Sequence, residues 1–171
     1  MEIKNYRIFT RAALLLALTI LFQSLRLFIP MPAVFSTFLI GSLVNACLLV
    51  TIDTVGLWPA LMIGAAAPVV AWFQQLLPVP VFIFPVAFAN LIYVTIFFAL
   101  RGNMPWFGLV VAATAKTLLL TMSITWLLTF VNLSPQVSAA IVFVMSWPQF
   151  VTAIIGGLLA HYVTKRLQRI L

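Results

Sequence analysis

The segment AVFSTFLIGSLVNACLLVTI, residues 33–52, runs for 20 residues without an Asp, Glu, Lys or Arg. A helix needs about 20 predominantly apolar residues to cross the hydrocarbon core of a bilayer. The segment is therefore predicted to be a transmembrane helix. The rest of the chain is similar, since 65% of its 171 residues are hydrophobic, only 6% are charged and the mean hydropathy is +1.24. Soluble domains carry roughly 25% charged residues, so an integral membrane protein is predicted.

Prolines, glycines and polar pairs divide the chain into six such segments. The predicted helices cover residues 8–28, 33–52, 55–73, 86–100, 105–130 and 136–166. Asp53 begins a tight turn and is a candidate N-cap for the third helix. The proline-rich connection at 74–85 is the one long loop, and it is a candidate cover for an outward-facing cavity. The expected fold is a single all-α transmembrane domain over residues 1–171, built as a bundle of six helices.

The basic residues predict the orientation of this bundle. If both termini are cytoplasmic, the inner side holds seven of the nine Lys and Arg residues, namely Lys4, Arg7, Arg11, Arg101, Lys165, Arg166 and Arg169. This distribution follows the positive-inside rule. Five spans would instead place basic clusters on both sides. The sequence therefore favours six spans, cytoplasmic N and C termini, and a location in the bacterial cell membrane.

The scarcity of polar chemistry excludes several classes of function. The two acidic residues are Glu2 and Asp53, and the one histidine is His161, so no carboxylate pair, metal-ligand cluster or Ser/His/Asp set is expected. The single cysteine, Cys47, lies in an apolar run and is expected to pack in the interior. The net charge of +7 gathers at helix ends and indicates orientation, not nucleic-acid binding. The chain is predicted to be neither an enzyme nor a metal or cofactor protein.

Lys116 is the most informative residue, because it lies near the middle of the predicted helix 105–130. A charge at that depth costs on the order of 2.5–3.5 kcal/mol on insertion scales. Three explanations are open: Lys116 is neutral, it binds backbone carbonyls and water, or a ligand supplies an anion. A simpler alternative is that the helix frame is shifted and the side chain reaches the inner interface.

A second group of residues completes the candidate substrate site. Embedded polar and aromatic side chains that can contact a ligand, but can equally bridge helices or lie at the interface, are Asn90, Gln149, Trp126, Trp147, Tyr93 and Arg26. For Arg26, near the outer end of the first helix, an interfacial position is favoured. For Asn45, a packing role is favoured. No carboxylate is expected inside the membrane, so an anionic or neutral ligand is predicted.

Three stretches of the sequence resemble a known transporter family. FLIGSLVNA at 38–46 and GLWPALMIGAAAP at 56–68 resemble the second and third helices of the S components of energy-coupling factor vitamin transporters. WPQFVTAIIGGLLA at 147–160 resembles their sixth helix. Length, helix number and short turns agree with the family across nearly the whole chain.

The resemblance implies a function and a set of partners. S components bind a micronutrient in an outward-facing pocket and dock on a membrane coupling subunit that sits on two ATPase subunits. A small-residue stripe on their first helix contacts the coupling subunit, and Ala13 and Ala17 match its spacing. The chain lacks the histidine-bearing N-terminus of the metal-transporting members, so a cobalt or nickel substrate is not expected. Two alternatives from other classes are a structural scaffold, such as a cell-shape protein, and a stand-alone small permease.

Overall fold

The computed structural model describes residues 2–30 and 32–169, without the side chains of residues 2–5 and 33. Lys4 and Glu2, which entered the charge analysis, are among these undescribed side chains. The described residues form helices only: α1 Glu2–Phe28, α2 Ala33–Thr54, α3 Leu57–Phe73, the 3-10 turn η1 Pro80–Phe82, α4 Ile83–Leu100, α5 Pro105–Leu128, α6 Pro135–Val144 and α7 Trp147–Leu167. The prediction of an all-helical fold is confirmed, while six spans and cytoplasmic termini stay predictions.

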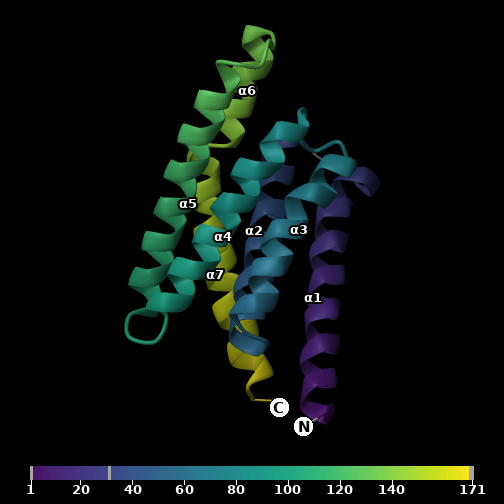
Figure 1. The fold of residues 1–171 in the computed structure, drawn as a ribbon, viewed down its shortest axis with the longest axis vertical. Coiled ribbons are helices and arrows are strands. Elements are labelled where there is room, and N and C mark those ends of the chain that lie inside the picture. The colour runs from purple at the N-terminus through teal and green to yellow at the C-terminus, as the bar shows by residue number, and fades with distance from the viewer. Residues whose placement is uncertain (1, 31, 170–171) are drawn as a thin grey trace.

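Five stretches within the described residues are long and apolar enough to cross a membrane, and the pair α6–α7 forms one of them. The helix α3 is also apolar but has 17 residues. In Figure 1 the helices run roughly alongside one another, with α1 at one edge and α5 at the other. The beginning of α1 and the end of α7 lie at the same end of the molecule, which we call the basic end (Figure 1).

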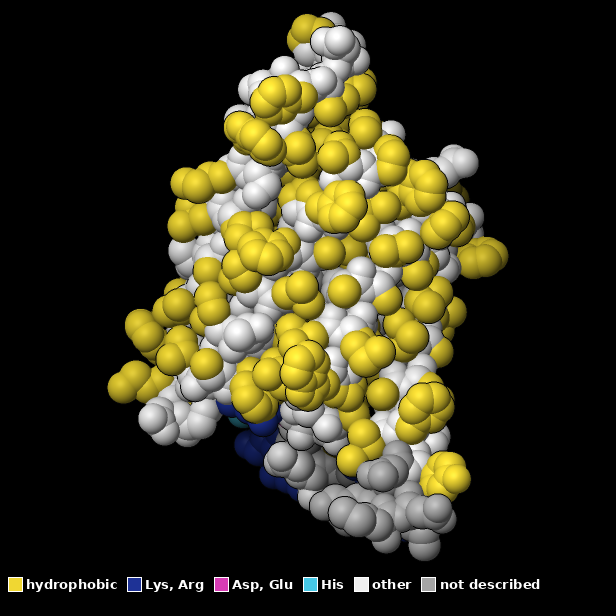
Figure 2. Space-filling model, viewed as in Figure 1, with side chains coloured by type: hydrophobic (Ala, Val, Ile, Leu, Met, Phe, Trp, Pro, Cys, Tyr) yellow, Lys and Arg dark blue, Asp and Glu magenta, His cyan; other side chains and the backbone are white. Residues whose placement is uncertain are grey.

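The basic end is defined by its charged residues. Figure 2 shows Lys and Arg side chains gathered there, while the face in view is otherwise dominated by apolar side chains.

Asp53 lies in the last turn of α2 and does not cap α3, whose N-cap position is held by Gly56. This corrects the predicted capping role. A carboxylate at a helix C-terminus opposes the helix dipole, and the ion pair with Arg101 offsets that cost.

Small residues bring α2, α5 and α7 into close contact. The most extensive packing between helices is that of α2 against α7. A Cβ atom built on Gly156 would lie 2.6 Å from the Cβ of Asn45 and 2.8 Å from the carbonyl oxygen of Ser42. A Cβ on Gly157 would lie 2.3 Å from Leu109 Cδ1. At position 156 only glycine permits the approach, because two of its neighbours are backbone atoms, whereas at position 157 a larger residue would require the Leu109 side chain to shift. Such close packing stabilises membrane helices.

The predicted helix 136–166 is in fact two helices. The break falls at Met145 and Ser146, just before Pro148, whose nitrogen cannot donate to the carbonyl of Val144. Gln149 compensates, because its Nε2 donates to that carbonyl oxygen at 3.1 Å. Nonhelical backbone at membrane depth requires such replacement partners.

The proline-rich connection is also shorter than predicted. Residues 80–82 form a 3-10 turn and α4 begins at Ile83, so Pro85 lies in the first turn of α4. The first-turn N–H groups of a helix have no partner inside it, and a proline there loses no hydrogen bond. Leu77 and Phe82 are buried, which ties the connection to the bundle.

Candidate functional site

A buried hydrogen-bond network surrounds Lys116. The Lys116 ammonium donates to Asn45 Oδ1 at 2.6 Å and to Asn90 Oδ1 at 3.0 Å, and its side chain is almost fully buried. It also lies 5.1 Å from the centre of the Tyr93 ring. The Tyr93 hydroxyl is turned away and donates to the carbonyl of Ala153 at 2.8 Å. The Lys116 amine is thus surrounded by amide oxygens and an aromatic face, which together replace part of its hydration.

The two asparagines extend this network to further helices. Asn45 Nδ2 donates to Thr152 Oγ1 at 3.4 Å, and Asn90 Nδ2 donates to the carbonyl of Gly64 at 3.1 Å. With Lys116 at the centre, the network connects α2, α3, α4, α5 and α7. We call the set Lys116, Asn45, Asn90, Tyr93 and Thr152 the lysine network.

The described partners of Lys116 are not among those named from the sequence, since both acceptors are side-chain amide oxygens and not backbone carbonyls. A neutral lysine and a ligand anion stay predictions. Asn45, for which packing is favoured, does pack against α7 and also forms the shorter contact to Lys116. The sequence did contain a signal for this contact. Asn45 and Asn90 both lie near the middle of apolar helices, at the same depth as Lys116.

The remaining candidate site residues lie elsewhere. Gln149 satisfies the carbonyl left free by the α6–α7 break. Trp126 is 63% exposed and stacks edge-on against Phe130, and Trp147 is 52% exposed beside Phe38. Both indoles are therefore largely on the outer surface of the chain. Of the seven residues predicted for the substrate site, the structure brings together Lys116, Asn90 and Tyr93.

Arg26 is held between α1 and α2 near the end opposite the basic end. Its Nε donates to Ser36 Oγ at 2.8 Å and its Nη2 approaches Thr37 Oγ1 at 3.4 Å. Both partners are hydroxyls at the start of α2. The guanidinium therefore fixes the α1–α2 corner, with no carboxylate in contact within the described part of the chain.

The face of α1 that carries Ala13 and Ala17 is exposed, so neither alanine is used to pack this chain on itself. Beside Ala13 runs a groove of about 590 Å³ between α1 and α3, lined by apolar residues that include Leu16, Pro59 and Met62. A helix from another protein can approach this face closely because the alanine side chains are short.

Metal binding finds no support in the residues that the structure describes, since they contain no group of three or more His, Cys, Asp and Glu side chains. Cys47 is buried in α2, as predicted from its apolar surroundings. Comparison of the chain with protein-family models, with curated proteins and with solved structures gave no match in any of the three.

Proposed function

We propose that this multi-pass membrane protein is the substrate-binding subunit of an importer of the energy-coupling factor type, which captures a small organic micronutrient. In this proposal the chain crosses the cell membrane six times with both termini in the cytoplasm. The basic end is the cytoplasmic end, because an excess of Lys and Arg marks the cytoplasmic side. The partners are a membrane coupling subunit, docked on the Ala13 and Ala17 face, and two ATPase subunits.

The observation that carries the proposal is the near-complete burial of the ionisable Lys116 side chain, whose two hydrogen-bond acceptors among the described residues are neutral amide oxygens. Ionisable groups inside membrane domains usually mark ligand or ion pathways, because their insertion is costly. A structural scaffold gains nothing from a lysine at this depth that an apolar side chain would not provide at lower cost. The described spans offer this cation only neutral acceptors, so the site as built favours a ligand with an anionic or neutral group over a cationic one.

Asn45→Asp tests this role directly. The substitution is nearly isosteric and places a carboxylate where the amide oxygen now accepts from Lys116 at 2.6 Å. The new carboxylate should neutralise Lys116 and repel an anionic ligand, and we expect at least about tenfold weaker binding, the scale of one charged hydrogen bond. Binding would be measured in detergent with pantothenate, biotin and nicotinate as probes, after mass spectrometry of the small molecule that co-purifies.

Arg166→Gln is the matched control, because it also lowers the net charge by one but lies exposed in the last turn of α7. Its affinity should equal that of the wild type. A cationic vitamin in the co-purified extract, or unchanged affinity in a folded Asn45→Asp variant, would contradict the proposed site.

Co-purification separates the rival functions. A binding subunit should retain a coupling subunit and ATPases when it is isolated from its native membrane. A stand-alone permease should transport in vesicles without them, and a scaffold should do neither.

The six-span topology has its own test. Cys47 is 3% exposed, so its thiol should not react with the reagent and any labelling can be assigned to an introduced cysteine. Pro78→Cys, in the α3–α4 connection, should react with an impermeant thiol reagent added outside the cell. Gly102→Cys, in the exposed α4–α5 turn, should react only after the membrane is opened. The reverse pattern would invert the proposed orientation.

A further inference from the structure

Besides the groove between α1 and α3, a cavity lies at the basic end, and none of the lysine-network residues lines it. It has a volume of about 310 Å³, opens to the surface and is lined by residues of α2, α4, α5 and α7 and of the α4–α5 turn. Its polar side chains are Asp53, Arg101 and His161, and Trp106 forms part of its aromatic wall. The His161 and Trp106 rings are in contact, with centroids 5.0 Å apart.

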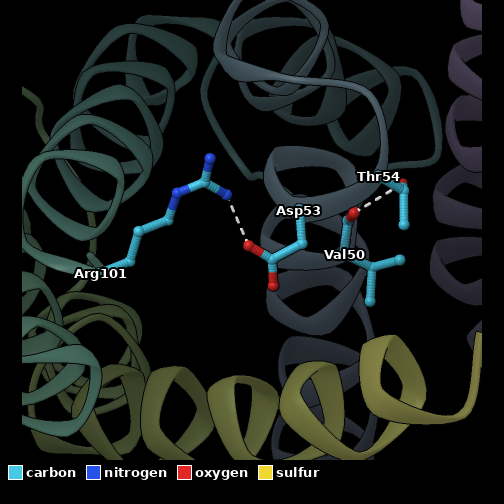
Figure 3. Close-up of polar contacts among 4 residues, drawn as sticks. All are labelled: Val50, Asp53, Thr54 and Arg101. Carbon is cyan, nitrogen blue, oxygen red and sulfur yellow. Dashed lines mark hydrogen bonds and ion pairs between the residues drawn. The ribbon is translucent and has the colours of Figure 1, made fainter. Parts of the chain in front are cut away.

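Asp53 and Arg101, the two charged residues of this cavity, form an ion pair that leaves one carboxylate oxygen available for a further hydrogen bond. Arg101 Nη1 lies 2.6 Å from Asp53 Oδ1, and the side chains are 31% and 24% exposed (Figure 3). The contact uses one oxygen of the carboxylate and one nitrogen of the guanidinium. Among the described residues, the other carboxylate oxygen accepts no hydrogen bond. The Arg101 guanidinium also rests 4.7 Å from the centre of the Phe98 ring, which fixes its direction.

The surroundings of the cavity indicate what kind of molecule fits it. Asp53 is the one acidic side chain that the structure describes, so an ammonium group finds its carboxylate partner here. Arg101 and His161 offer donors to a phosphate on the same wall. Next to the cavity, Trp106 and Phe107 are exposed apolar residues in the first turn of α5, where acyl chains can lie along them. Tryptophan is enriched at this level of membrane proteins, where headgroups and chains meet.

We propose that this cavity binds the headgroup of a phospholipid that carries both a phosphate and a primary ammonium, as in phosphatidylethanolamine. The phosphate is bound by Arg101 and His161, and the ammonium donates to the free oxygen of Asp53. A lining that holds both signs of charge suits a zwitterion better than a purely anionic headgroup. Cavities between helices at the basic side of membrane proteins are established headgroup sites. This site is independent of the substrate proposed above.

The test compares three lipids with identical acyl chains: phosphatidylethanolamine, phosphatidylcholine and phosphatidylglycerol. Each is added in equal amount to the detergent-purified protein, and bound lipid is counted by native mass spectrometry. We expect phosphatidylethanolamine to be retained about three- to fivefold more than the other two, the scale of one partly exposed charge interaction. Phosphatidylcholine cannot donate from its methylated nitrogen, and phosphatidylglycerol has no ammonium.

Variants then assign the contacts. Asp53→Asn should reduce the retention of phosphatidylethanolamine to that of phosphatidylcholine, and Arg101→Gln should lower the retention of all three lipids. Arg166→Gln, an exposed cation at the same end but outside the lining, should change nothing. Asp53→Glu keeps the charge and should keep the preference, so it tests the assignment if Asp53→Asn does not fold.

Three results would overturn the proposal, and two of them come from the lipids themselves: equal retention of phosphatidylethanolamine and phosphatidylcholine by the wild type, or a preference that persists in Asp53→Asn. The third comes from a soluble competitor. Soluble glycerophosphoethanolamine serves as a competitor. Its failure to displace the lipid at equal concentration supports a lipid site, whereas full displacement would assign the cavity to a soluble zwitterion instead.

Discussion

The helices α1 and α2 are both long and apolar enough to cross a membrane, yet they occupy opposite positions in the fold. Of the most apolar part of each, 61% of the residues are buried in α2 and only 11% in α1. Lipid is as apolar as leucine, so apolar side chains alone give no reason for one helix to be central. The difference lies in the small and polar residues of α2, where Gly41, Ser42 and Asn45 face α7.

Small residues are not sufficient by themselves. Ala13 and Ala17 give α1 a similar spacing, but they lie on its exposed side. In α2 the small residues that face α7 are accompanied by Asn45, which bonds to Lys116 and Thr152 on other helices. Helix α1 also bonds to other helices, through Gln23 to the carbonyl of Ala67 and through Arg26 to Ser36, but its Ala13 and Ala17 are exposed. We infer that a central position requires close approach and polar partners in the same interface. Four tests, at Gly156, at Lys116, at Asp53 and at the alanines of α1, probe this comparison.

The largest effect on stability is expected at the α2–α7 contact. In Gly156→Ala the new methyl group would collide with Asn45 and with backbone at Ser42, neither of which can move away. We expect a loss of about 2–3 kcal/mol in the free energy of unfolding, measured by titration with denaturing detergent. Gly102→Ala is the control, since nothing lies within 4 Å of its new Cβ, and its effect should stay below about 0.5 kcal/mol. Equal stability of the two variants would show that the contact is looser than described.

Lys116→Met removes the centre of the polar network. Two buried amide oxygens then lose their donor, and we expect unfolding to become easier by about 1–2 kcal/mol. If the proposed function is right, affinity for an anionic ligand falls by about 1.5–3 kcal/mol, or roughly ten- to over a hundredfold. Affinity is measured on the folded fraction, so the two effects separate. Full retention of affinity would leave Lys116 a purely structural role.

Asp53→Asn tests the basic end of α2, where the ion pair with Arg101 is partly exposed. Exposed pairs contribute little, and a loss of about 0.5 kcal/mol is expected. The difference between variant and wild type should shrink further as salt is raised from 0.1 to 1 M, because screening weakens the pair. A loss above about 2 kcal/mol would mean that α2 depends on this contact as much as on its packing.

The smallest effect on stability is expected on α1. Ala13→Leu and Ala17→Leu add side chains to an exposed face, so unfolding and ligand affinity in detergent should change by less than about 0.5 kcal/mol. Co-purification with a coupling subunit and transport should nevertheless be lost, because the proposed helix contact is sterically blocked. A parallel loss of affinity and transport would contradict the role assigned to this face.

The sequence by itself determined that this is an all-helical membrane protein, roughly where its helices lie, and that basic residues gather at one end. These properties follow from local composition, since crossing a bilayer depends on the length and polarity of a single segment. Even the buried lysine was visible as a charge near the middle of an apolar run.

Tertiary structure alone decided what surrounds that lysine. Its acceptors Asn45 and Asn90 are 71 and 26 residues away along the chain, and no local pattern selects them over the other embedded amides. Gln149 differs, because it was predicted as a ligand contact but satisfies the carbonyl of Val144, which lies 5 residues away and is left free by Pro148. Hydropathy is a property of single residues, whereas the contacts of Lys116 depend on how close the backbones of different helices come, and glycines such as Gly156 set that distance.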